Sequence, residues 1–91
     1  MPAEKPQVWV PGKICTLSEV KSGHRIKIMA VRIADPARER LYAQGFLENR
    51  QGQILHNDHR GRVMLRLEGE IYLLGRLETA QIQVREYLLS R

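Results

Sequence analysis

The sequence predicts a mainly β protein, a small five- to six-stranded β-barrel with one short α-helix at about residues 36–44. Several short segments alternate apolar and polar residues, and turn residues separate them at the close spacing of a small barrel. Only one longer stretch carries both a helix start signal and a helix stop signal. The 91 residues suffice for one domain with one core, and this core must be mostly aliphatic because only 5% of the residues are aromatic.

Residues 1–13 contain three of the four prolines and show no periodicity, so we expect an extended N-terminal arm. Trp9 is expected to anchor this arm on the barrel or on a neighbouring subunit, because a lone aromatic residue without interleaved basic residues is a poor stacking site for a ligand. The barrel domain is expected at residues 14–87, followed by a C-terminal tail at 88–91. The edge strands of so small a barrel are open to pairing, so a homodimer or a domain swap stays open, with the N-terminal arm as one route.

The first long strand is expected at residues 25–33. Ile26 and Ile28 share one face of it, but the apolar positions further along are Val31 and Ile33. The alternation therefore changes phase between these two pairs. One extra residue in a strand has this effect, so the pattern predicts a β-bulge and a strongly bent strand, which suits a small barrel.

The predicted helix lies between Asp35 and Gly45. Asp35 can cap it by accepting free N–H groups of the first turn, and Pro36 occupies the first helical position, where a missing N–H costs nothing. Gly45 is expected to end the helix in the left-handed conformation. A helix of roughly nine residues is not stable alone in water, so it must pack on the β framework.

The second half of the chain is expected to be mostly strands. A weak strand is predicted at residues 52–56, and the clearest alternation of the chain lies at 62–68. Gly69 marks a tight hairpin, after which Ile71 and Leu73 are expected to continue the inward face. The remaining elements are expected to be one helical turn at 77–80 and a last strand that contains Ile82 and Val84.

Composition points to a cytoplasmic protein. The N-terminus has no apolar block of signal-peptide length, and no apolar run approaches the roughly 20 residues that cross a bilayer, so no direct membrane insertion is expected. The formal net charge is +5, but the excess is spread thinly along the chain without a basic block. Such a surface is expected to attract nucleic acid or anionic lipid only weakly.

One cluster has the character of a metal site, formed by His56, Asp58 and His59. Imidazole and carboxylate ligands suit first-row divalent metals, so weak binding of iron or zinc is one interpretation, although no cofactor is required. The cluster lies on a predicted turn, which favours a solvated polar turn instead. Cys15 is the single cysteine and is expected to be a small, partly buried hydrophobe. No nucleophile is paired with a base at a recognisable spacing, so the sequence predicts a protein that is not an enzyme.

The C-terminal end of the predicted helix is the better candidate for a partner-binding site, formed by Arg40, Leu41, Tyr42, Gly45 and Phe46. Leu41 is expected to face the core. An exposed aromatic pair, Tyr42 and Phe46, would offer a compact anchor for a partner. The alternative is that Phe46 plugs the end of the barrel.

The order of these parts resembles the FeoA family, the small cytosolic components of bacterial ferrous-iron uptake. The matching positions are Leu17, Val20 and Gly23 with the strand at 26–28, the helix end from Arg40 to Phe46, the hairpin glycine Gly69, and Ala80, Ile82 and Val84. The similarity covers about residues 16–86. The departures from the family pattern are Gln44, Glu48 with Asn49, Gly52 in place of a branched strand residue, and Gly75.

The resemblance implies an SH3-like β-barrel that acts as a non-enzymatic adaptor. It would assist FeoB, the GTP-dependent ferrous-iron permease, by docking on the cytosolic side of that membrane protein. Two alternatives stay open at this point. One is a small basic barrel that binds nucleic acid, which Glu68, Glu70 and Glu78 near the outward arginines disfavour. The other is a metal chaperone that uses the turn at His56, Asp58 and His59.

Overall fold

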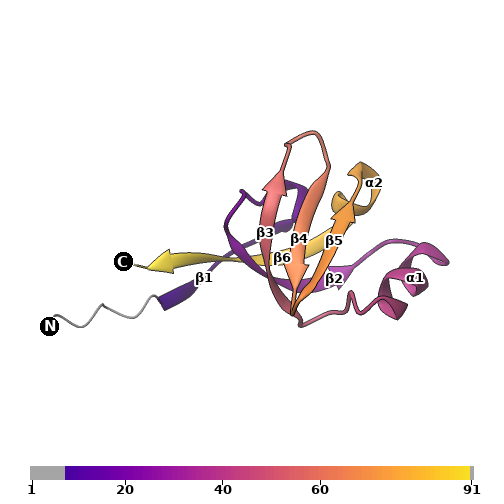
Figure 1. Cartoon of the computed structure of the whole chain (residues 1–91), viewed down its shortest axis with the longest axis horizontal. Coiled ribbons are helices and arrows are strands. Elements are labelled where there is room, and N and C mark those ends of the chain that lie inside the picture. The colour runs from indigo at the N-terminus through magenta and orange to yellow at the C-terminus, as the bar shows by residue number, and fades with distance from the viewer. Residues whose placement is uncertain (1–7, 91) are drawn as a thin grey trace, which may run out of the picture.

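The computed structural model describes residues 8–90, which form six antiparallel strands in one curled sheet together with short helical segments (Figure 1). The strand order in the sheet is β1-β6-β2-β3-β4-β5, so β1 and β5 are its edges. The elements in chain order are β1 (Val8–Thr16), the 3₁₀-helix η1 (Leu17–Glu19), β2 (Arg25–Val31), α1 (Ala37–Ala43), β3 (Gln51–Asn57), β4 (Val63–Leu67), β5 (Glu70–Leu74), α2 (Arg76–Thr79) and β6 (Ile82–Ser90). The prediction of a mainly β fold with a short helix is confirmed.

The core lies on the inner side of this curled sheet. Burial alternates along β2 and β4, as expected for strands with one face inward and one face toward water. The described side chains with no exposed surface in this core are Leu17, Val20, Ile26, Ile28, Phe46, Ile54, Val63, Leu65, Leu67, Ile82 and Val84. Full burial of one such side chain stabilises the fold by about 1.5–3 kcal/mol, so the inner face supplies most of the driving force for folding.

The bulge expected in β2 is confirmed. The pairing of β2 with β6 shifts register between Ile28 and Ala30. The shift lets Ile28 and Val31 both point into the core, although an unbroken alternation would put them on opposite faces. The bend also directs the chain away from the sheet toward α1.

The start of α1 differs from the expected cap. The N-cap position is occupied by Pro36, which has no side chain able to accept a hydrogen bond, and no side-chain cap is formed. Asp35 lies outside the helix, where its Oδ2 accepts a hydrogen bond from Arg38 Nη2 at 3.2 Å. A capping side chain must belong to the N-cap residue itself to reach the free N–H groups of the first turn. The prediction that Asp35 caps the helix is therefore wrong.

The two ends of the described chain form a long ribbon in place of an unpaired arm and tail. Val8 lies opposite Ser90, and the pairing of β1 with β6 continues to Thr16 opposite Gln83, with one irregularity after Pro11. Residues 8–13 of the expected arm and 88–90 of the expected tail are thus strand, and the rest of both segments lies outside the described residues. In Figure 1 this ribbon extends away from the barrel, on the side opposite the two helices.

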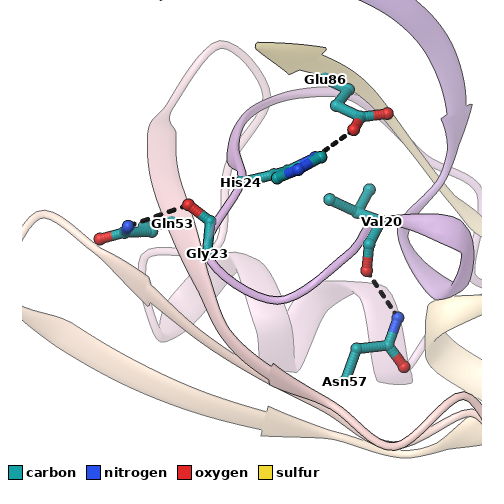
Figure 2. A network of polar contacts seen from close by, with 6 residues as sticks. All are labelled: Val20, Gly23, His24, Gln53, Asn57 and Glu86. Carbon is teal, nitrogen blue, oxygen red and sulfur yellow. Dashed lines mark hydrogen bonds and ion pairs between the residues drawn. The ribbon is translucent and has the colours of Figure 1, made fainter. Parts of the chain in front are cut away.

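A polar network holds the loop between η1 and β2 against the barrel (Figure 2). Asn57 is buried, and its Nδ2 donates to the carbonyl oxygen of Val20 at 2.7 Å. Gln53 Nε2 donates to the carbonyl oxygen of Gly23 at 3.0 Å. His24 Nδ1 donates to a carboxylate oxygen of Glu86, which is 7% exposed. Asn57 and Gln53 thus satisfy two carbonyl groups of this loop, and the Gly23 N–H donates to the carbonyl oxygen of Ile54 in β3 at 2.7 Å.

Within residues 8–90, neither helix has the length or the apolar character to cross a bilayer.

Candidate partner-binding surface

The C-terminal turn of α1 is closed as the sequence predicts. Gly45 has φ +91°, in the left-handed region. The N–H of Phe46 donates to the carbonyl oxygen of Leu41 at 2.9 Å, and the N–H of Gly45 donates to that of Tyr42 at 3.0 Å. These two bonds define a Schellman motif, in which glycine supplies the left-handed residue and an apolar residue follows it. The turn therefore has a fixed shape.

Of the two interpretations of Phe46, the structure agrees with the one in which it plugs the end of the barrel, so Tyr42 and Phe46 do not form an exposed aromatic pair. Phe46 has no exposed surface, and its ring meets that of Tyr72 edge-on with centroids 5.3 Å apart. Leu41 is also buried, as predicted. The part of the predicted site that a partner can reach is Arg40, which is exposed, with Tyr42 and Gly45, which are half-buried.

Tyr42 is tied to the loop after the helix. Its hydroxyl donates to Oε1 of Glu48. This hydrogen bond is the main cause that raises the pKa of Tyr42 above its ordinary value, and it is also the main cause that lowers the pKa of Glu48. The tyrosine therefore stays protonated and the glutamate ionised at neutral pH, and together they fasten α1 to the segment that enters β3.

We expect Tyr42→Phe to lower the free energy of unfolding at pH 7, because the hydrogen bond to Glu48 is lost. The pKa of Glu48 is lower in the folded state than in the unfolded state, so its contribution is present above the unfolded pKa and fades as the pH falls through the folded pKa. Urea unfolding at pH 7 and at acid pH should show the difference between wild type and variant shrinking as the pH falls below the ordinary carboxyl range. Tyr87→Phe is the matched control, and an equal effect at both pH values would contradict the assignment.

A shallow groove lies between the end of α1 and the β4–β5 hairpin. Tyr72 Oη donates to the carbonyl oxygen of Gln44 at 2.5 Å, and Arg50 Nη1 donates to that of Gly45 at 2.6 Å. The other guanidinium nitrogen, Arg50 Nη2, donates to Glu68 at 2.5 Å and lowers the pKa of that carboxyl. Helix end and hairpin are thus joined across the groove. Its lining residues are Ala43, Gln44, Gly45, Arg50, Glu68, Glu70, Ile71 and Tyr72.

Exposed apolar side chains continue from this groove over the outer face of β4 and β5. Met64 is 37% exposed, Ile71 57% and Leu73 69%. Met64 lies directly opposite Leu73, and Ile71 lies opposite Arg66, so the three apolar side chains form one patch. We call Met64, Ile71 and Leu73 the hairpin patch. It lies at an edge of the sheet, because β4 is the one strand that pairs with β5 within residues 8–90.

The expectation that Ile71 and Leu73 point inward is wrong. Gly69 and Glu68 both have positive φ, of +91° and +46°, and they form the two-residue hairpin turn that the sequence predicts. This turn places Leu67 opposite Glu70, and therefore Leu65 opposite Tyr72. The inward residues of β5 are consequently Tyr72 and Leu74, and Ile71 and Leu73 face outward.

The turn at His56, Asp58 and His59 does not assemble a metal-binding group. Among residues 8–90 no three His, Cys, Asp or Glu side chains are placed to hold one ion. Asp58 Oδ1 accepts hydrogen bonds from the N–H groups of Arg60 at 2.7 Å and Arg62 at 3.0 Å, and the first of these is the main cause of its lowered pKa. Both histidines are exposed. The carboxylate therefore shapes the turn, as the solvated-turn interpretation requires.

Cys15 is half-buried at the end of β1. Burial is the main cause that raises the pKa of its thiol, and the carboxylates of Glu86 and Glu19 add to the effect. The sulfur is therefore a neutral thiol at pH 7, which is the less reactive form.

A family model described as the FeoA domain matches residues 15–86 of the chain. The crystal structure of an iron uptake regulatory protein (FeoA) superposes with a TM-score of 0.72 at 20% identity, over 81% of this chain and 99% of that one. An FeoA-like protein from Clostridium acetobutylicum gives 0.69 at 23% identity, over 88% and 93%. A manganese-dependent transcriptional repressor gives 0.70 at 18% identity, over 82% of this chain and 42% of the repressor. No curated protein sequence matches at a significant level. These structural similarities confirm the predicted SH3-like barrel.

Proposed function

The chain belongs to the FeoA family, and on that basis we propose that it is a non-enzymatic accessory protein of ferrous-iron uptake. Family membership implies a part in ferrous-iron transport. The finer proposal is that the protein works by direct contact with the cytosolic part of a FeoB-type permease. Iron is the cargo of that permease in this proposal, and this chain contributes a binding surface.

The observation that supports a contact function is the hairpin patch beside the groove at the end of α1. Three large apolar side chains of 37–69% exposure stand together on an edge of the sheet. Contiguous apolar surface on a small domain marks an interaction site more often than isolated apolar residues do. The rigid turn at Gly45 and the charged Arg50 and Glu68 border it, which gives the apolar centre and polar rim of a protein interface.

We expect Leu73→Asp to weaken binding to the purified cytosolic domain of the permease at least about tenfold. The substitution places a charge in the middle of the apolar patch, and its side chain is 69% exposed, so the fold should be retained. The dissociation constant can be measured by biolayer interferometry with the permease domain immobilised.

Leu88→Asp is the matched control, because Leu88 is also an exposed leucine on a strand but lies on the β1–β6 ribbon, far from the patch. It should bind the permease domain as the wild type does. Equal binding by wild type and Leu73→Asp would remove the hairpin patch from the interface, and no binding by the wild-type protein would refute the proposed contact.

A further inference from the structure

The β1–β6 ribbon carries apolar side chains on both of its faces. Val8, Val10 and Leu88 continue the inner face of the sheet beyond the end of the core, where they are 53%, 39% and 42% exposed. Trp9 lies opposite Leu89 on the other face, and Leu89 is 37% exposed. In Figure 1 the ribbon extends past the barrel, so no part of the described chain covers its end. Trp9 is half-buried under the guanidinium of Arg25, whose Cζ lies 5.6 Å from the centroid of its ring. Packing within residues 8–90 therefore does not account for the exposed apolar surface of the other four side chains.

Beside the ribbon, the outer face of the sheet gathers basic residues from three strands. Arg25 and Lys27 of β2, Arg66 of β4 and Arg85 of β6 alternate with buried neighbours and so share the outer face. Strand pairing places them together. The directly opposed residues run Tyr87, Arg25, Gln53 and Arg66 in one row, and Arg85, Lys27 and Gln51 in the next.

This basic face is not cancelled by nearby acids. The depression between β2, β3 and β4 is lined by Arg25 and Arg66 and by a single carboxylate, that of Glu68. Glu68 is already paired with Arg50 at 2.5 Å. Arg85 uses one nitrogen for the carbonyl oxygen of Gly12, a neutral partner, and keeps its net charge. The face therefore carries four positive charges, of which Arg66 is exposed and the other three are on half-buried side chains.

From this juxtaposition we infer that the ribbon end and the basic face together form a docking surface for an anionic phospholipid bilayer. The apolar end would rest at the level of the headgroups and the first acyl carbons, with Trp9 at the boundary, where indole rings are preferred. Arg85 lies three residues before Leu88, which at about 3.3 Å per residue is roughly 10 Å along the strand. That distance matches the depth of about 5–10 Å to which interfacial apolar residues are buried. With Leu88 buried to this depth, Arg85 would lie at the level of the lipid phosphates.

Charge complementarity favours a lipid surface over the other possible occupants. A second copy of this chain, with formal net charge +5, would bring like charges together at the basic face. Single-stranded nucleic acid would use the cations and stack bases on the aromatic rings, but it offers nothing to Val8, Val10 and Leu88. A bilayer with anionic headgroups matches both the apolar end and the cations. This inference does not depend on the proposed permease contact, because the ribbon end is built from β1 and β6 and the hairpin patch from β4 and β5. Arg66, which lies opposite Ile71, is the member of the basic face that borders the patch.

The test is binding of the full chain to phosphatidylcholine vesicles with and without phosphatidylglycerol. Trp9 is the single tryptophan, so its fluorescence reports the ribbon directly. We expect a shift of emission to shorter wavelength with the anionic vesicles alone, and co-sedimentation with them that weakens at high salt. Val10→Asp and, separately, Arg66→Glu should each weaken partitioning at least about tenfold, by removing apolar contact and by reversing a charge at the lipid surface.

Leu77→Asp is the matched control, because Leu77 is also an exposed leucine but lies on α2, on the side of the molecule opposite the ribbon, and it should bind vesicles as the wild type does. Equal binding to neutral and anionic vesicles, or unchanged binding by Val10→Asp, would overturn the inference. It would also be overturned if light scattering showed a dimer that Val10→Asp abolishes, or if a single-stranded oligonucleotide bound the face and the vesicles did not.

Discussion

Replacing Phe46 by alanine is expected to lower the free energy of unfolding by about 3–5 kcal/mol. Phe46 is the largest described side chain without exposed surface, and it packs edge-on against Tyr72. Truncation would leave a cavity under the turn at Gly45, because the Schellman motif holds the backbone of Phe46 in place and limits collapse. A loss of this size is a large part of the roughly 5–15 kcal/mol that stabilises a typical domain.

Urea unfolding followed by circular dichroism measures this effect, with Phe46→Leu as the matched variant. Leucine keeps most of the apolar volume, so its cost should be about 1–1.5 kcal/mol. The alanine variant should also weaken permease binding, since Tyr72 loses its ring partner and its hydroxyl is the group that ties the groove to Gln44. If both variants cost less than about 1 kcal/mol, Phe46 does not plug the barrel as described.

The elements that sequence reasoning located well are those with a complete local signal. Gly45 follows a short helical stretch and ends it, and Gly69 lies between two alternating segments and turns the chain. The bulge before Ala30 appears in the sequence as a change of phase. In each case the conformation depends on residues within a few positions of one another, so a sequence pattern contains the whole cause.

Two errors arose where the local signal was ambiguous. Pro36 and Asp35 are both typical of helix starts, but the N-cap position belongs to only one of them. In β5 the residues at 71–74 are all apolar, so alternation cannot tell the inner face from the outer face. Counting outward from the hairpin turn at Gly69 would have assigned Tyr72 to the core, because the turn type fixes the register of both strands.

The basic face could not be recognised from the sequence, because its members are far apart in the chain. Arg25, Arg66 and Arg85 come from the beginning, the middle and the end of the barrel, and the strand order places them side by side. The same holds for His24 and Glu86, which are 62 positions apart and meet at the base of the ribbon. A charge distribution that looks thin along the sequence becomes a concentrated surface once the sheet is formed.

Gly52→Ala is expected to cost about 3 kcal/mol or more, although it adds a single methyl group. An added Cβ would lie 2.1 Å from the carbonyl oxygen of Arg66 and 2.4 Å from Leu67 Cδ2. The first contact is with backbone, so rotation of a side chain cannot relieve it and β3 must move away from β4. The departure from the family pattern at Gly52 therefore has a structural reason in this chain.

Gly69→Ala is the matched control for that prediction. Gly69 has φ +91° but no atom within 4 Å of an added Cβ, so alanine there should cost only about 1–2 kcal/mol for the left-handed backbone. Thermal unfolding of the two variants compares steric and conformational strain directly. A larger loss for Gly69→Ala than for Gly52→Ala would mean that β3 and β4 lie farther apart than the distances at Gly52 indicate.

Because Gln53 and Arg66 lie opposite each other across this contact, a Gly52→Ala protein that still folds should also bind anionic vesicles more weakly.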